Sequence, residues 1–182
     1  MSLAVHLLID TSGSMNSQIE QASLTAYSLC DALAGVPGIN VAATAFPGGQ
    51  LRNTGRGVDH WATVSPLLKH GQAMHRRFQL FAAGTTPLAQ ALWWVIQDMV
   101  PLSESRKVIF IVTDGVPDSD EEAMAAIREG RNLGLEIYGL GLGTDSVKNL
   151  LPGRSVIISN FLELPQKLFW LLGQVLTVTI TN

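Results

Sequence analysis

The sequence predicts an α/β protein with a doubly wound, mostly parallel central sheet of about six strands, flanked by helices on both faces. Three observations support this fold class. Segments of strand length alternate along the chain with segments of helical periodicity. The strand segments are almost entirely apolar, as expected of strands that are covered on both faces. A composition of 47% apolar and 15% charged residues gives a chain of 182 residues enough apolar surface to bury a core.

The first half of the chain combines apolar runs with one clear amphipathic helix. Its predicted elements are strand 3–10, helix 16–34, strand 39–46, loop 48–57, a short edge strand 58–64 that returns as a hairpin, and a weakly patterned, partly helical stretch 69–83. Gly35 follows the last apolar residue of the first helix and favours its termination there. Four glycines within 48–57 indicate a loop.

The second half continues the alternation of helices and strands. Its predicted elements are helix 87–99, strand 107–113, helix 118–132, strand 136–142, short helix 145–151, strand 155–159 and closing helix 162–175. Pro87 stands at the first turn of a helix, where its missing N–H costs nothing. Acidic residues crowd the first turn of the next helix, where the helix dipole favours them. Because no repeat or linker interrupts the pattern, we expect residues 1–182 to form a single domain.

Charge and composition exclude several classes of protein. A net charge of −3 and an isoelectric point near 5.7 argue against general nucleic-acid binding. The longest apolar stretch, 168–180, is too short and too interrupted to span a bilayer. The single cysteine, Cys30, cannot form an internal disulfide and is expected to be a small buried apolar residue. With no signal peptide apparent, we expect a cytoplasmic protein.

Polar residues collect at three points where a doubly wound sheet presents its carboxyl edge. The segment from Asp10 to Ser14 follows the first strand, 84–87 precedes a helix, and 113–115 ends a central strand. Adjacent parallel strands bring such segments together in the crevice where ligands bind. The group contains carboxylates and hydroxyls without sulfur or a nearby histidine, which favours Mg²⁺ or Mn²⁺ over zinc or copper. Neutral hydroxyls leave such an ion under-neutralised, so that a carboxylate from a partner or ligand can complete its shell.

These three segments resemble the von Willebrand factor A (VWA) domain with a metal-ion-dependent adhesion site (MIDAS). The signature of that site is D-x-S-x-S, a distant threonine and a later aspartate, and the resemblance covers essentially the whole chain. It implies a Rossmann-like fold and the following metal site: Asp10, Ser12, Ser14, Thr86 and Asp114, with Thr85 as the alternative threonine. In the family the serine hydroxyls bind the metal directly, whereas the aspartates often act through water.

A narrower resemblance concerns intracellular A domains. The residues Thr86-Pro87-Leu88, Thr113-Asp114-Gly115 and the closing stretch 161–165 are similar to the A domains of cobaltochelatase T subunits. Those proteins work beside AAA+ ATPases of the MoxR or chelatase type. They usually carry a long acidic N-terminal region, which the present sequence lacks, so it is interpreted as an excised C-terminal domain or a stand-alone relative.

Three classes of function are compatible with this site. The leading prediction is a non-enzymatic, Mg²⁺-dependent interaction module that binds a partner carboxylate and serves an AAA+ ATPase complex. A metal-dependent phosphohydrolase is an alternative, although Ser12 stands where aspartyl phosphatases place a second aspartate, and no P-loop or G-x-S-x-G motif occurs. The third possibility is a structural interaction domain with a vestigial metal site.

Other polar and aromatic residues allow two interpretations each. The acids of 118–122 form a capped helix start or a second cation site, and Trp93-Trp94 supply core or contact surface. A basic group, whose members form a solvated face or a docking surface for an acidic segment, comprises Lys69, His70, His75, Arg76 and Arg77. His6 is expected to be a core histidine with its hydrogen bonds satisfied, and His60 has no visible metal-ligand partner. The glycines of 139–143 are attributed to close packing rather than to a dinucleotide loop.

Overall fold

The computed structural model describes residues 2–48 and 63–177, and its centre is a six-stranded sheet in the order β3-β2-β1-β4-β5-β6. The strands are β1 (Leu3–Asp10), β2 (Ile39–Phe46), β3 (Ser65–Leu68), β4 (Arg106–Thr113), β5 (Glu136–Leu142) and β6 (Ser155–Ile158). Neighbouring strands run parallel except β2 and β3, which are antiparallel. The predicted fold class is confirmed.

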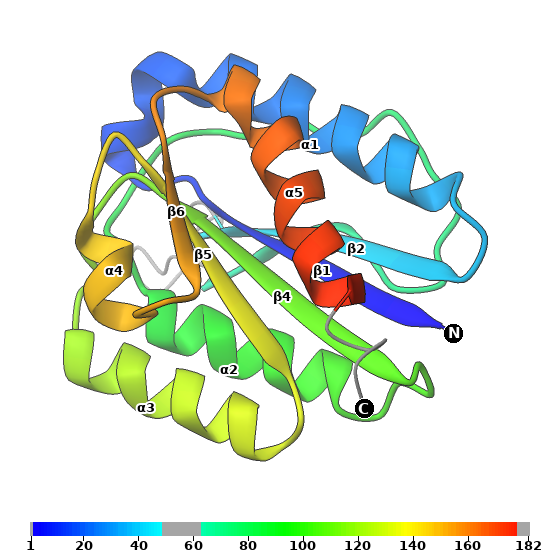
Figure 1. Cartoon of the computed structure of the whole chain (residues 1–182). Coiled ribbons are helices and arrows are strands. Elements are labelled where there is room, and N and C mark those ends of the chain that lie inside the picture. Colours follow the sequence, from blue (N-terminus) through cyan, green and yellow to red (C-terminus); the bar gives the residue numbers. More distant parts are fainter. Residues whose placement is uncertain (1, 49–62, 178–182) are drawn as a thin grey trace, which may run out of the picture.

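Helices cover both faces of this sheet. They are α1 (Ile19–Ala34), α2 (Leu88–Met99), α3 (Asp120–Asn132), α4 (Ser146–Leu150) and α5 (Leu164–Thr177), with short 3₁₀ turns η1 (Gly13–Gln18) and η2 (Phe161–Glu163). In Figure 1, α1 and α5 lie on one face, and α2 and α3 lie on the other. No helix among the described residues combines the length and apolarity needed to cross a lipid bilayer.

Strand β1 divides the core into two clusters. All eight of its residues are buried, as the near-continuous apolar run predicts. Val5, Leu7 and Ile9 belong to the cluster beneath α1 and α5, whereas Ala4 and Leu8 belong to the cluster beneath α2 and α3. This alternation follows from the period-2 geometry of a strand and places His6 on the α2 face.

The helix predicted within residues 69–83 is wrong. Residues 69–83 contain no helix. Phe78 and Leu80 are buried, while Arg77, Gln79 and Phe81 between and beside them are exposed. This period of two belongs to an extended backbone and not to a helix.

The strand predicted over 58–64 falls mostly outside the described residues, and so does loop 48–57. The antiparallel edge strand that the structure does describe is β3, at Ser65–Leu68.

Glycines in β5 let a helix and a loop approach the sheet. A Cβ on Gly141 would lie 2.3 Å from the backbone oxygen of Thr144, and one on Gly139 would lie 3.0 Å from a methyl carbon of Leu151. A side chain on Gly141 therefore requires the backbone to move, whereas one on Gly139 requires the Leu151 side chain to shift. The prediction of close packing is confirmed for Gly139 and Gly141, while Gly143 has open space around it and a φ of +63°, which favours glycine.

Candidate metal site at the carboxyl edge of the sheet

The ends of β1 and β4 bring the first and last predicted site segments together. The two strands are parallel neighbours, and Ile9 is paired with Val112 in their register. Asp10 and Thr113 therefore end adjacent strands at the same edge, and Asp114 follows directly. The register accounts for the meeting of residues about 100 positions apart in sequence.

Asp10 is a buried carboxyl group that accepts hydrogen bonds from Ser12 and Thr113. The backbone N–H of Ser12 donates to Asp10 Oδ1 at 2.7 Å, and the Thr113 hydroxyl donates to Asp10 Oδ2 at 2.5 Å. Burial raises the pKa of Asp10 above its usual range, the hydrogen bonds from Thr113 and Ser12 oppose that change, and the charge of Asp114 adds to it. The carboxyl group is thus held in one orientation by neutral donors.

The two serines connect Asp10 to Asp114. The hydroxyl oxygens of Ser12 and Ser14 lie 3.1 Å apart, and the Ser14 hydroxyl donates to Asp114 Oδ1 at 2.8 Å. Ser12 is buried, whereas Ser14 is exposed. The spacing of two residues therefore brings the hydroxyls of Ser12 and Ser14 together beside Asp114.

The structure distinguishes the two candidate threonines. The Thr85 hydroxyl donates to Asp118 Oδ2 at 2.8 Å, so it is already engaged outside the crevice. Thr86 is buried, and its hydroxyl oxygen would lie 3.7 Å from a Cβ on Gly115. That position is next to Asp114, which favours Thr86 over Thr85 as the threonine of the site.

Asp118 has a positioning role that the sequence analysis did not assign. Its Oδ1 accepts a hydrogen bond of 2.8 Å from the Thr86 backbone N–H, and its own N–H donates to the Thr86 carbonyl at 3.0 Å. Its carboxylate therefore already accepts hydrogen bonds from the loop that carries Thr85 and Thr86. Ser119 caps α3 by accepting from the Glu122 N–H at 3.2 Å. These contacts favour the capped helix start over a second cation site.

Backbone contacts join the first and second segments. The Gly13 N–H donates to the Gly84 carbonyl at 3.2 Å, and the Ala83 N–H donates to the Thr11 carbonyl at 2.9 Å. A Cβ on Gly13 would lie 3.6 Å from that Gly84 oxygen. The approach of the two loops is therefore close, and it holds the threonine loop beside the serine turn.

The donor set of this crevice fits a hard divalent cation. Each candidate side chain offers a carboxylate or hydroxyl oxygen, and neither sulfur nor imidazole is among them. Oxygen ligands of this kind suit Mg²⁺ and Mn²⁺. Fold and donor set together define a class of α/β domain, in which a doubly wound sheet carries carboxylate and hydroxyl side chains at its carboxyl edge.

The chain belongs to the von Willebrand factor type A domain family, whose model matches residues 4–153. No curated protein sequence matches the chain.

Solved structures share the fold at low sequence identity. Proximal thread matrix protein 1 of the mussel byssus has a TM-score of 0.67 at 15% identity, over 94% of this chain and 47% of that one. The present chain thus spans about half of that relative. Another structure of that protein, described as having a zinc-occupied MIDAS motif, has a TM-score of 0.64 at 16% identity over 91% and 43%.

Two further structures come from a parasite and a bacterium. The manganese-loaded TRAP protein of Plasmodium vivax has a TM-score of 0.67 at 17% identity, covering 91% of this chain and 71% of that one. The domain of the type V pili tip protein Mfa5 of Porphyromonas gingivalis has a TM-score of 0.68 at 11% identity, covering 100% and 97%. At these identities the likeness shows the fold alone.

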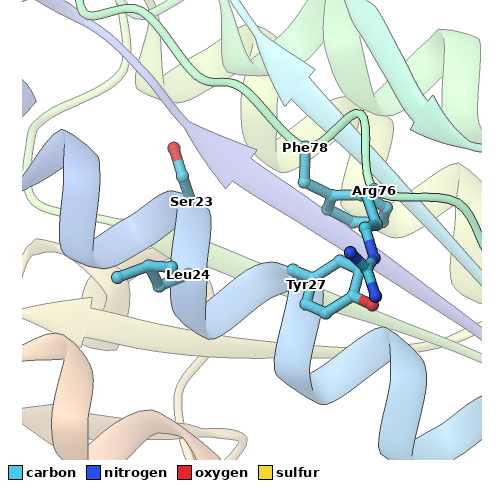
Figure 2. Close-up of a pocket in the computed structure, with 5 residues that line it drawn as sticks. All are labelled: Ser23, Leu24, Tyr27, Arg76 and Phe78. Atoms are coloured by element: carbon cyan, nitrogen blue, oxygen red, sulfur yellow. The ribbon is translucent and has the colours of Figure 1, made fainter.

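A separate hollow of about 350 Å³ lies between α1 and residues 69–83, which we call the extended segment (Figure 2). It is lined by Ser23, Leu24, Tyr27, Arg76 and Phe78. The rings of Tyr27 and Phe78 meet edge to face with their centroids 5.5 Å apart, while Leu24 is 71% exposed. Apolar rings and a basic side chain therefore share one open surface, and both interpretations of the basic group remain compatible with it.

The remaining candidate residues are placed as follows. Trp93 is 40% exposed, and Trp94 is partly buried against the core beneath α2. Cys30 is buried as predicted, and its burial raises the pKa of the thiol to about 12. His60 lies outside the described residues.

Proposed function

We propose that this chain is a metal-dependent protein-interaction module that binds a partner's carboxylate at a divalent cation. Asp10, Ser12, Ser14, Thr86 and Asp114 would hold the ion. The observation that carries the proposal is the meeting of these residues at one edge of the sheet, linked by the Ser12–Ser14 and Ser14–Asp114 contacts of 3.1 and 2.8 Å. When bound, the ion would supply a positive centre for an acidic side chain.

Mg²⁺ is the proposed ion, with Mn²⁺ as the alternative. The all-oxygen donor set favours these two ions. The related TRAP structure is manganese-loaded, and one mussel structure is described with zinc in its MIDAS motif, which supports a divalent ion at this place in the fold.

The proposed partner is a protein with an exposed acidic side chain, in the setting of a MoxR-type or chelatase-type AAA+ ATPase in the cytoplasm. Support for the acidic partner is chemical, because direct contact through neutral hydroxyls, with the two aspartates acting through water as the resemblance implies, leaves room for a further carboxylate on the ion. Arg76, in the hollow between α1 and the extended segment, offers a positive charge to the same acidic partner. The AAA+ setting rests on the resemblance to cobaltochelatase T subunits.

Two alternative functions are kept as secondary proposals. VWA domains are generally interaction modules rather than enzymes, which supports a non-catalytic role. A metal-dependent phosphohydrolase of the aspartyl type would carry a second aspartate two residues after the first, and Ser12 stands at that position, with its hydroxyl 3.1 Å from that of Ser14. A structural domain with a vestigial metal site is the other alternative.

Calorimetric titration of Mg²⁺ and Mn²⁺ tests the proposal. The wild-type chain is expected to bind one ion at this site, and an Asp10→Ala/Ser12→Ala double variant is expected to bind it at least ~100-fold more weakly. Ser28→Ala, which removes an exposed hydroxyl on α1, is the matched control and should bind as the wild type does. Equal affinity in the double variant and the wild type would contradict the proposed site.

A matched pair of threonine variants tests the ligand assignment. Thr86→Val is expected to weaken cation binding, because it removes the hydroxyl directed toward Gly115. Thr85→Val removes only the contact with Asp118 and should leave most of the affinity intact. The reverse order of the two effects would assign the site to Thr85.

A further inference from the structure

A second group of metal-ligating side chains lies on the α2 face of the sheet, away from the carboxyl edge. His6 comes from the middle of β1, His70 follows β3, and Asp98 is on the last turn of α2. The Nδ1 atom of His6 lies 3.2 Å from His70 Nε2 and 4.0 Å from Asp98 Oδ2. One ligand atom from each residue lies within 4.8 Å of the other two.

The buried histidine is already oriented as a ligand would be. Its Nε2 lies 2.8 Å from the hydroxyl oxygen of Thr44 on β2, and both side chains are buried. When Nε2 carries the proton and donates to Thr44, the Nδ1 lone pair faces His70 and Asp98.

The second histidine stands on a turn that is fixed to the sheet. Gly71 has a φ of +75°, a conformation that favours glycine, and the Gln72 N–H donates to the Lys69 carbonyl at 3.0 Å to close the turn. The Gly71 N–H also donates to the side-chain oxygen of Asn40 at 2.8 Å. The position of His70 is therefore set by backbone contacts that do not depend on a metal.

The two imidazole rings of this group face each other. The Nδ1 atom of His70 is buried. The other nitrogen, Nε2, faces the Nδ1 of His6, and at most one proton can lie between these two atoms. With one proton between them the two rings form an N–H···N hydrogen bond of 3.2 Å, and a cation bound by both nitrogens would replace that proton.

The spacing agrees with tetrahedral coordination. With Zn–N bonds of about 2.0–2.1 Å, two nitrogen ligands of a tetrahedral zinc ion lie about 3.3 Å apart. The 3.2 Å between the two ring nitrogens matches that value. Asp98 is at 4.0 Å, and its side chain is 38% exposed, so a change of rotamer can bring its oxygen closer.

Polar side chains behind the two histidines can hold the imidazole rings in place. Glu104 interacts with His70 through its charge and accepts a 2.6 Å hydrogen bond from the Asn40 amide. Thr44 instead contacts its histidine directly, with its hydroxyl oxygen 2.8 Å from Nε2 of His6. Trp94 closes one side of the group, with its ring 6.4 Å from that of His6. Carboxylates and hydroxyls behind imidazole ligands are the usual means of orienting them.

We propose that His6, His70 and Asp98 form a Zn²⁺ site, with a water molecule or a ligand atom from a partner in the fourth position. Nitrogen ligands separate it chemically from the oxygen-lined crevice at the carboxyl edge. His6 stands four residues before Asp10 on β1, so the two sites are about 13 Å apart. The site is independent of the proposed Mg²⁺ module, and neither requires the other.

Zinc titration in the presence of excess Mg²⁺ tests this site. The wild-type chain is expected to bind one equivalent of Zn²⁺ that Mg²⁺ does not displace, and its melting temperature should rise on binding. His70→Ala is expected to weaken that binding at least ~100-fold. His75→Ala removes a partly buried histidine five residues further along the chain and should leave Zn²⁺ binding unchanged.

The Asp10→Ala/Ser12→Ala variant separates this proposal from the function proposed above. It should lose Mg²⁺ and keep the Mg²⁺-resistant Zn²⁺ equivalent, whereas His70→Ala should keep Mg²⁺. Co²⁺ in place of Zn²⁺ gives a second readout, because a tetrahedral site with nitrogen ligands has a visible spectrum unlike that of an octahedral oxygen site. A wild-type chain that binds no Zn²⁺ beside Mg²⁺, or a His70→Ala variant that binds it equally well, overturns the proposal.

Discussion

Single residues decide how the carboxyl edge is charged. Asp10 is buried and its pKa is raised, yet hydrogen bonds from Ser12 and Thr113 keep its carboxyl group in one orientation. A buried charge that is oriented but not paired lowers the stability of the chain until a cation or proton arrives. The cost of burying Asp10 and the affinity of the crevice for a cation therefore have the same origin.

His6 gives the chain a pH-dependent stability. Burial lowers the pKa of His6 well below its ordinary value of 6.5, and His70 adds to this effect. Below about pH 6.5 the unfolded chain takes up a proton at this position and the folded chain does not, so folding stability is lost as the pH falls. The groups that face His6 are His70 and Asp98, and Glu104 lies behind His70.

We expect the unfolding free energy in EDTA to fall between pH 7 and pH 5, with His6 contributing at most about 1.4 kcal/mol per pH unit. Urea unfolding at a series of pH values measures it. His6→Gln keeps a donor for Thr44 but does not titrate, so its dependence should be shallower by that contribution. Equal slopes in the two proteins would show that His6 is not responsible.

At the scale of elements, the extended segment shows where sequence periodicity misleads. The stretch 69–83 has no strong helical stripe, and we expected part of it to be helical. Phe78 and Leu80 instead reach the core beneath α1 from an extended backbone, on alternate residues. A short segment with two anchors offers too few repeats to separate a period of 2 from one of 3.6, and tertiary packing settles the choice.

The contrast between Phe78 and Phe81 tests this arrangement. Phe78 is 6% exposed and Phe81 is 68% exposed, although in a helix the two would share one face. We expect Phe78→Ala to destabilise the chain by about 3–5 kcal/mol and Phe81→Ala by less than about 0.5 kcal/mol. Denaturant unfolding of both variants gives the comparison. Similar losses for the two would place both rings in the core and contradict the extended segment.

The buried strands and most of the helices were predictable because their signals are local. Leu3–Asp10 and Arg106–Thr113 are apolar runs bounded by polar residues, and the alternation of such runs with helices fixes the fold class. The candidate crevice was predictable for the same reason, since parallel neighbouring strands end at one edge. Asp118 was missed because its contacts with Thr85 and Thr86 bridge more than 30 positions, which no local pattern reports.

The group formed by His6, His70 and Asp98 illustrates the same limit at the scale of the whole molecule. Sequence spacing separates these residues by 64 and 28 positions, without any recognisable ligand motif. They meet because β1 lies next to β2, β3 adds to the edge beyond β2, and α2 crosses the face beneath them. A histidine expected to be a satisfied core residue is thus hydrogen-bonded to Thr44 and also faces two further potential ligands.

The two regions also differ in their access to partners. Ser14 is exposed at the carboxyl edge, so an ion there can receive a group from outside. If a partner's carboxylate completes the shell, cation and partner must strengthen each other's binding by the same factor, because coupling between two ligands is reciprocal. Typical coupling free energies of 1–3 kcal/mol correspond to factors of about 5–150.

This reciprocity yields a prediction for the whole chain. An acidic peptide that binds the chain is expected to bind about 5–150-fold more tightly with Mg²⁺ than with EDTA, and saturating peptide should raise Mg²⁺ affinity by an equal factor. Calorimetry in both directions measures the two factors. The amide version of the peptide, with glutamine for glutamate, is the control and should show no coupling. Tight binding of the acidic peptide that is indifferent to Mg²⁺ would instead place its contacts on the basic hollow around Arg76 and leave the metal crevice without a role in partner recognition.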